Sequence, residues 1–327
     1  MKLYSKQTLS VPLAAMSESG RFVHSYIITG EKGAGKKTAA KYTAMMLLCS
    51  DVHDGRPCGV CRECRRILSG VHPDCISAEK SKKSYSVDDM RDIVTDAYTS
   101  PNDCDRKVYL ITDCGGWSDA AQAAMLKVTE DPPDPVYFIF TGDDLSVFLP
   151  TLISRSMVID ITTADRDACM EYMHDTYPDR PEEELIRAAD AFGGNIGRCT
   201  ELLEGDEKLL DLAERVRRTA AACAVCDEYT AAAVLSGIRD RDVFRQMLGM
   251  LCAVVRDAAV MKSGAQPGSY IGCDRGSAAK LSAFPASRLI QMYDSLTYTA
   301  QLCGLNCNLD SAAAMLAGRI AGRKGHI

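Results

Sequence analysis

The sequence predicts an α/β domain with a parallel sheet, followed by a part of the chain that is entirely helical. Three observations support this fold class. Short apolar runs suited to buried strands occur up to about Ile161, a glycine-rich loop follows the first of them, and the rest is rich in Ala, Leu and Met with charges at helical spacing. Strands that alternate with helices indicate βαβ units, which build parallel sheets.

The elements of the first part follow from local patterns. Residues 25–29 (SYIIT) form a short β-rich run, and residues 38–48 after the glycine loop are Ala-rich and helix-like. Residues 108–112 and 136–141 are continuous apolar runs, as expected for strands covered by helices on both faces. Residues 119–130 predict a helix that ends before Pro132-Pro133.

The later part of the chain predicts helices, including residues 181–192 and 243–262. Glycine-containing breaks near residues 193–197 and 204–206 divide it. We therefore predict three domains, at residues 1–161, 162–206 and 207–327.

Composition favours a folded protein of the cytoplasm. The 327 residues are 46% hydrophobic and 25% charged, no apolar run is long enough to span a membrane, and the first residues do not resemble a signal peptide. The fifteen cysteines are therefore expected to be mostly reduced. The net charge is −6, and residues 207–327 hold only 15 Lys and Arg against 11 Asp and Glu. Charge alone does not predict a dedicated nucleic-acid binder.

The loop that follows residues 25–29 has the spacing of a phosphate-binding loop, in which backbone N–H groups and a lysine hold phosphate oxygens. Its residues are Gly30, Gly33, Gly35 and Lys36. Such a loop ends in Ser or Thr, whose hydroxyl binds Mg²⁺, but here Lys37 follows and Thr38 lies one residue further on. Two interpretations stay open: a loop that has lost its nucleotide, and one that binds nucleotide without efficient hydrolysis.

The strand at residues 108–112 leads to a single acid, Asp113. An ATPase needs one acid for Mg²⁺ and a second group to orient the attacking water. The sequence therefore predicts that both halves of a hydrolytic site are incomplete.

Four cysteines predict a structural zinc site within residues 49–64. The spacing C-x8-C-x2-C-x2-C suits a closed tetrahedral set of thiolates, which leaves no coordination position for a catalytic water. Redox thiols and an iron–sulfur cluster are the alternatives. The predicted ligands are Cys49, Cys58, Cys61 and Cys64.

Arg155 lies in the segment Ser154-Arg-Ser156, which we expect at or near the start of a helix at the domain edge. Together with other motifs, this segment resembles one family, the delta-prime subunits of bacterial DNA polymerase III clamp loaders. The motifs occur in order: His24-Ser-Tyr, the glycine loop, the four cysteines, His72-Pro-Asp74, Ser86-Val-Asp88, Ala124-Met-Leu-Lys127, Glu130-Asp-Pro-Pro133 and Ser154-Arg155.

The resemblance implies an AAA+ P-loop domain with the zinc insertion, a small helical lid and an all-α collar. It also implies assembly into a hetero-pentameric ring that loads the sliding clamp onto primed DNA, as part of a DNA-directed DNA polymerase holoenzyme. Arg155 matches an arginine finger that acts in trans on nucleotide bound to a neighbouring subunit. Thr112 and Asp113 match the magnesium-binding Asp and the catalytic Glu of active relatives, so we expect no efficient ATPase activity from this chain.

Two alternatives remain at this stage. The chain could be an active clamp-loader ATPase in which Thr38 supplies the missing hydroxyl, or an AAA+ adaptor outside replication. The single acid at Asp113 argues against the first, and co-purification with clamp-loader subunits would exclude the second.

Overall fold

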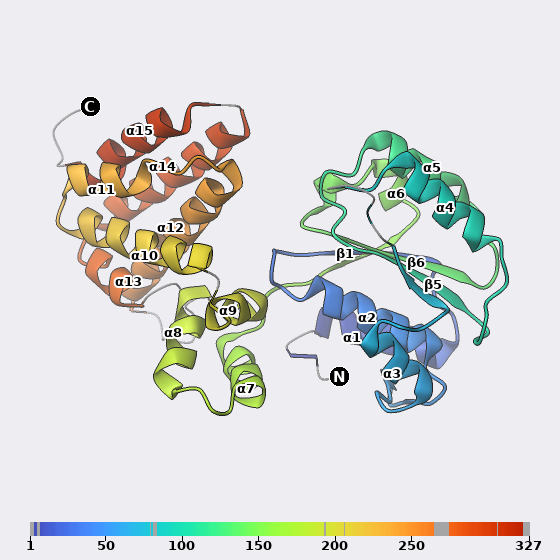
Figure 1. Ribbon diagram of the computed structural model, residues 1–327. Coiled ribbons are helices and arrows are strands. Elements are labelled where there is room, and N and C mark those ends of the chain that lie inside the picture. Colours follow the sequence, from blue (N-terminus) through green and yellow to red (C-terminus); the bar gives the residue numbers. More distant parts are fainter. Residues whose placement is uncertain are drawn as a thin grey trace. The chain divides into compact units, whose positions relative to one another are not determined.

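The computed structural model describes residues 3–4, 7–78, 80, 84–192, 194–205, 207–264, 275–305 and 307–322. The chain divides into two compact units, Met1–Thr163 and Ala164–Ile327. The first is α/β and the second is helical throughout its described residues (Figure 1).

The first unit contains seven strands and six α-helices in its described residues. In chain order they are α1 (Gln7–Ser19), β1 (Ser25–Thr29), α2 (Lys36–Leu48), β2 (Val52–His53), β3 (Arg56–Pro57), α3 (Arg62–Ser69), β4 (Cys75–Ser77), α4 (Val87–Ala97), β5 (Lys107–Ile111), α5 (Asp119–Glu130), β6 (Val136–Gly142), the 3₁₀ turn η1 (Leu145–Val147), α6 (Pro150–Ile153) and β7 (Met157–Asp160). The strands and helices predicted in this part are confirmed, with bounds that differ by no more than two residues.

Five of these strands form one parallel sheet in the order β4-β5-β6-β1-β7. Every residue of β1, β5 and β6 is buried, because helices cover both faces of the sheet. Helices α1, α2 and α3 pack on one face, whereas α4, α5 and α6 pack on the other (Figure 1). The predicted fold class, a P-loop α/β domain with a parallel sheet followed by helices, is confirmed.

The order of the strands places β1 between β6 and β7. The chain leaves β1, builds β4, β5 and β6 on one side, and then crosses to the other side for β7. The carboxyl ends of β1, β5 and β6 therefore meet at one edge of the sheet. In open parallel sheets, ligands bind at this edge where the strand order reverses.

The described helices of the second unit pack around two clusters of buried hydrophobic side chains. One lies around Cys169, Met173 and Leu185, and the larger one includes Phe244, Leu248 and Leu316. The division at residues 162–206 and 207–327 stays a prediction. The helices are α7 (Arg166–Thr176), α8 (Glu182–Phe192), α9 (Ile196–Leu203), α10 (Glu207–Ala224), α11 (Glu228–Leu235), α12 (Arg241–Lys262), α13 (Arg275–Leu281), α14 (Ala286–Gly304) and α15 (Leu309–Ala321).

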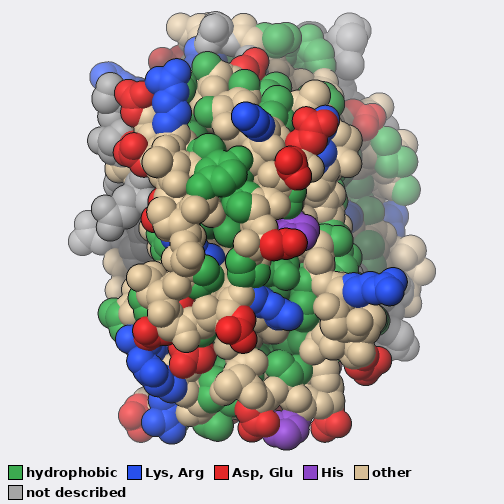
Figure 2. Space-filling view, turned by 90° about the vertical axis from the view of Figure 1, so that its right-hand side faces the viewer, with side chains coloured by type: hydrophobic (Ala, Val, Ile, Leu, Met, Phe, Trp, Pro, Cys, Tyr) green, Lys and Arg blue, Asp and Glu red, His purple; other side chains and the backbone are tan. Residues whose placement is uncertain are grey.

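Within the part of the chain that the structure describes, no helix has the length and apolar character needed to cross a membrane. Figure 2 shows one face on which acidic and basic side chains are interspersed among other residues and are not gathered by sign. This face of the described residues therefore presents no basic patch of the kind that holds a nucleic-acid backbone.

Candidate nucleotide site and metal centre

The glycine loop lies between the end of β1 and the first turn of α2, at the carboxyl edge of the sheet. Gly30 has φ 153°, and a Cβ added to it would lie 2.4 Å from the carbonyl oxygen of Ile161, so only glycine fits there. Gly35 precedes α2 with φ 88°, a left-handed conformation that glycine adopts without strain. The loop therefore has the position and backbone of a phosphate-binding loop.

Lys36, the lysine of the loop, is turned inward and is 8% exposed. Its Nζ donates hydrogen bonds to the carbonyl oxygens of Gly30 at 2.7 Å and Glu31 at 3.0 Å. It also contacts Asp143 Oδ1 at 2.8 Å, directly after β6. Asp143 was not among the predicted site residues. The only indication in the sequence is an acid next to the carboxyl end of a predicted strand.

Lys37 forms the second ion pair of the site. Its Nζ lies 2.6 Å from Asp113 Oδ2, so the residue in place of the magnesium-binding hydroxyl contacts the one acid after β5. Asp113 has φ 56°, and its backbone N–H donates to Thr141 Oγ1 at 2.9 Å. The ammonium group of Lys80 donates to the Asp113 carbonyl oxygen. The segment after β5 is thereby fixed beside the start of α2.

The other two predicted contacts, Thr38 and Thr112, have different surroundings. Thr38 is exposed on the first turn of α2, and Thr112 is half-buried after β5, where its carbonyl oxygen accepts a hydrogen bond from the Tyr85 hydroxyl at 2.9 Å. Their assignment to a nucleotide site stays a prediction. The geometry brings together Lys36, Lys37, Asp113 and Asp143, which the sequence places up to 107 residues apart.

Arg155 lies in the turn between α6 and β7. Its Nη1 donates to the carbonyl oxygen of Thr151 at 2.9 Å, and its Nη2 lies 3.1 Å from Glu130 Oε1 at the end of α5. The expected position near the start of a helix is wrong: Pro150 begins α6, the helix ends at Ile153, and Arg155 follows that end. Ser156 points inward, with its Oγ 2.7 Å from Ser25 Oγ, so the arginine and its neighbour face opposite ways.

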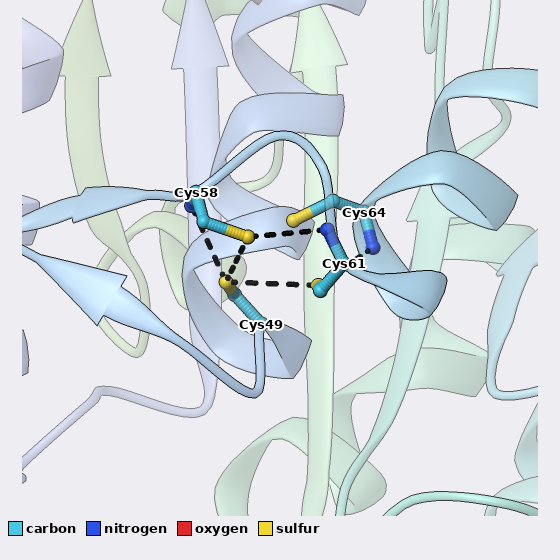
Figure 3. Close-up of side chains that lie close together, drawn as sticks. All are labelled: Cys49, Cys58, Cys61 and Cys64. Carbon is cyan, nitrogen blue, oxygen red and sulfur yellow. Dashed lines mark hydrogen bonds between the residues drawn. The ribbon is translucent and has the colours of Figure 1, made fainter.

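The four predicted zinc ligands come together at one place. Cys49 directly follows α2 as its C-cap, Cys58 follows the β2–β3 hairpin, and Cys61 and Cys64 lie at the start of α3 (Figure 3). Cys49 Sγ lies 3.6 Å from Cys58 Sγ and 3.9 Å from Cys61 Sγ, and all four sulfurs are within 4.8 Å of one another. A tetrahedral site with Zn–S bonds of about 2.3 Å places its sulfurs roughly 3.8 Å apart, so the residues fit zinc.

The surroundings of the cysteines suit thiolates. Backbone N–H groups donate to three of the sulfurs, at 3.3 to 3.4 Å. Burial acts to raise the pKa of Cys61, but hydrogen bonds from Cys64 and Ser50 outweigh it and lower the pKa to about 6. Burial raises the pKa values of Cys49 and Cys64, so these thiols need a bound cation to be ionised at neutral pH.

A second cluster, Glu63, His72 and Cys104, lies beside this centre. His72 Nδ1 accepts a hydrogen bond from the Asp74 backbone N–H at 3.0 Å, so in the neutral ring Nε2 carries the proton. That nitrogen lies 2.8 Å from Glu63 Oε2. In this tautomer the protonated Nε2 faces the Glu63 carboxylate and, at 3.7 Å, Cys104 Sγ, so it is not a metal ligand.

Asp74 fixes the loop that leads into β5. Its fully buried carboxylate accepts hydrogen bonds from the backbone N–H groups of Asn102, Asp103 and Cys104 and from the Asn102 side chain. Asp103 in turn contacts Arg62 and Arg66 of α3. Burial opposes ionisation of Asp74, but these donors outweigh it and hold its pKa below the ordinary value.

Replacing Asp74 by Asn is expected to lower the free energy of unfolding by about 2–3 kcal/mol at pH 7, because an amide cannot accept from all of these donors. A carboxyl group with a depressed folded-state pKa stabilises above its unfolded pKa, and this contribution is lost as pH falls through the folded value. The difference in the free energy of unfolding between the wild type and the variant should therefore become smaller below about pH 4. Urea unfolding at several pH values measures this difference, and the substitution of an exposed acid, Asp88→Asn, is the control. A difference in the free energy of unfolding that does not depend on pH would contradict the stabilising role of the Asp74 carboxylate.

The arrangement of the first unit defines its class. A parallel sheet in this order, with a glycine loop between its central β1 and the following helix, is the AAA+ form of the P-loop fold. Residues 5–165, nearly the whole first unit, match the family model described as DNA polymerase III, delta subunit. The first unit is therefore similar to that family, and the resemblance to delta-prime-type clamp-loader subunits is confirmed.

The chain is also similar to curated subunits of DNA polymerase III. The DNA polymerase III subunit delta' of Pseudomonas aeruginosa is 29% identical over 174 residues, which are 53% of this chain and 53% of that protein. The DNA polymerase III subunit tau of Escherichia coli is 30% identical over 178 residues, which are 52% of this chain and 28% of that protein. The chain thus spans about a quarter to a half of the length of these relatives.

Solved structures align over most of the chain with low similarity. A DNA polymerase III gamma subunit-related protein from Thermotoga maritima has a TM-score of 0.41 and 15% identity, with 97% of this chain and 100% of that chain covered. The DNA clamp loader delta protein of Bacillus subtilis has a TM-score of 0.36 and 8% identity, with 96% and 100% covered.

Proposed function

We propose that this chain is a delta-prime-type subunit of the DNA polymerase III clamp loader, which supports ATP-dependent loading of the sliding clamp onto primed DNA in the cytoplasm. The observation that carries the proposal is the pairing of Lys36 and Lys37, at the end of the glycine loop, with acids of the same unit. Arg155 lies at the surface of that unit, where its acidic partner, Glu130, is exposed.

Arg155 is proposed to act in trans, as an arginine finger toward nucleotide bound on a neighbouring subunit. Its side chain is 32% exposed and is held by Glu130, an exposed partner on α5, so it can exchange that carboxylate for a phosphate. A guanidinium offers paired N–H donors that match phosphate oxygens. It would stabilise the negative charge that develops on the transferring phosphoryl group.

The chain's own nucleotide site is proposed to be degenerate. Lys37 replaces the magnesium-binding hydroxyl, Thr112 stands where an acid would bind magnesium, and Asp113 is paired with Lys37. ATP with Mg²⁺ at this site is not expected to be hydrolysed efficiently. This arrangement disfavours the alternative in which Thr38 restores an active ATPase.

The zinc centre is proposed to be structural. Four cysteines would complete the tetrahedron and leave no open position, so a bound Zn²⁺ would join α2, the β2–β3 hairpin and α3 and take no part in phosphate chemistry. Residues 162–206 are proposed as the helical lid and residues 207–327 as the collar. The proposed partners are the other subunits of a hetero-pentameric ring and, through them, the clamp and primer-template DNA.

Reconstitution tests the function. The chain should co-purify with the motor subunits of the clamp loader, and its addition should raise their ATP turnover in the presence of clamp and primed DNA. The isolated chain should turn over ATP slowly or not at all. If the chain neither joins these subunits nor changes their turnover, the proposal fails and an AAA+ adaptor outside replication becomes the better hypothesis.

A further inference from the structure

Two lysines at the end of the glycine loop, Lys36 and Lys37, each have an acid in contact with the ammonium group. Lys36 lies against Asp143, which follows β6, and Lys37 lies against Asp113, which follows β5. The two acids come from neighbouring strands at the same edge of the sheet as the loop. The positive charges of Lys36 and Lys37 are therefore each paired with a carboxylate of the chain itself.

The two pairs correspond to the two interactions that a bound magnesium nucleotide makes in a P-loop. There, phosphate oxygens contact the loop lysine, and Mg²⁺ contacts a hydroxyl after the loop and an acid after a neighbouring strand. Here Asp143 Oδ1 lies 2.8 Å from Lys36 Nζ, where a phosphate oxygen would bind. The ammonium of Lys37, which stands in place of the hydroxyl, lies 2.6 Å from Asp113 Oδ2, directly after Thr112, the residue that matches the magnesium-binding acid.

We propose that Asp143 and Lys37 are an internal substitute for phosphate and magnesium. They keep the loop ordered and prevent a nucleotide from binding to it. Asp143 replaces the phosphate oxygen, and Lys37 replaces the cation. The inference deepens the degenerate-site part of the proposed function, because it names the groups that exclude the ligand.

The local contacts are consistent with a loop that needs no ligand to keep its shape. Lys36 also donates to the carbonyl oxygens of Gly30 and Glu31, so the lysine ties the loop to itself. The backbone N–H of Ala34 donates to the Glu31 carbonyl oxygen at 3.0 Å. An incoming nucleotide would have to displace Asp143 from Lys36 and would then meet two carboxylates of its own sign.

Binding of ATP to the isolated full-length chain tests the inference. The variant Asp113→Asn/Asp143→Asn keeps the shape of both side chains but removes both negative charges. The matched control is Asp119→Asn/Asp131→Asn, which removes two charges at the ends of α5 that form no ion pair with either lysine among the described residues. Asp113 and Asp143 are 49% and 69% exposed, so neither substitution disturbs the core.

A fluorescent ATP analogue and the thermal midpoint with and without 1 mM ATP are the measurements. Wild type and control are expected to show no saturable binding up to 1 mM and no ATP-dependent shift. The double variant is expected to bind at least tenfold more tightly than wild type, to be stabilised by ATP, and to lose both effects when Lys36→Ala is added. The inference is overturned if the wild type binds ATP with an affinity within twofold of that of the folded double variant. It is also overturned if the folded double variant does not bind ATP.

A second variant covers the case in which the double variant does not fold. Lys37→Thr removes the substitute cation and supplies a hydroxyl, so weak ATP binding that depends on Mg²⁺ and is abolished by EDTA is expected. Its absence in a folded protein would also overturn the inference. These measurements need no partner subunit, so they can fail while reconstitution succeeds, or succeed while reconstitution fails.

Discussion

Replacing Arg155 by alanine is expected to slow ATP hydrolysis on the neighbouring clamp-loader subunit by about 10³-fold or more, the range of known arginine fingers. The reason is that a cation is lost where negative charge develops in the transition state, while the backbone of the turn stays intact. Single-turnover hydrolysis in the reconstituted ring, with clamp and primed DNA present, is the measurement. The other nucleotide sites of the ring should retain their rates.

Two further variants separate this role from a structural one. Arg155→Lys keeps the charge but loses the paired N–H donors, so it should recover only part of the rate. Glu130→Gln releases the carboxylate that holds Arg155 Nη2 at 3.1 Å, and it should leave the rate unchanged or raise it. A ring that assembles with Arg155→Ala and hydrolyses ATP at the normal rate would exclude the proposed arginine finger. Assembly would show that the variant still contacts its neighbouring subunit.

Replacing Cys61 by serine is expected to have the second large effect, loss of bound zinc and of stability in the first unit. Cys61 contributes one of the four sulfurs and also precedes α3 as its N-cap, where its Sγ accepts the Cys64 backbone N–H at 3.4 Å. Structural zinc contributes directly to folding free energy. A loss of several kcal/mol corresponds to a fall of the thermal midpoint by about 10 °C or more.

Metal content and thermal unfolding measure this effect. The wild-type chain purified without chelators should hold one Zn²⁺, and the Cys61→Ser variant should hold far less. Cys104→Ser is the matched control, because Cys104 lies next to His72 in the neighbouring cluster and outside the four-sulfur set. Full zinc in Cys61→Ser, or its loss in Cys104→Ser alone, would contradict the assigned ligands.

Local sequence patterns were sufficient for the main elements of the first unit. The runs that became β1, β5 and β6 are mainly apolar, as a buried parallel strand requires, and α5 has the predicted bounds Asp119–Glu130. The four cysteines could also be predicted, because ligands within sixteen residues need only a turn and a helix start to meet. Strands β4 and β7 were not predicted, since three or four residues show too little periodicity.

The sequence by itself determined several of the charged groups: the loop lysines, a single acid after β5, and Arg155, but neither Asp143 nor the place of Arg155 after α6. Only the tertiary structure decided which partner each charge has. Lys36 meets Asp143 and Lys37 meets Asp113 because β5, β6 and β1 are neighbours in the sheet and end at one edge. Electrostatic attraction depends on the distance between charges, and residues 76 or 107 positions apart in the chain have no defined distance until the order of the strands is settled.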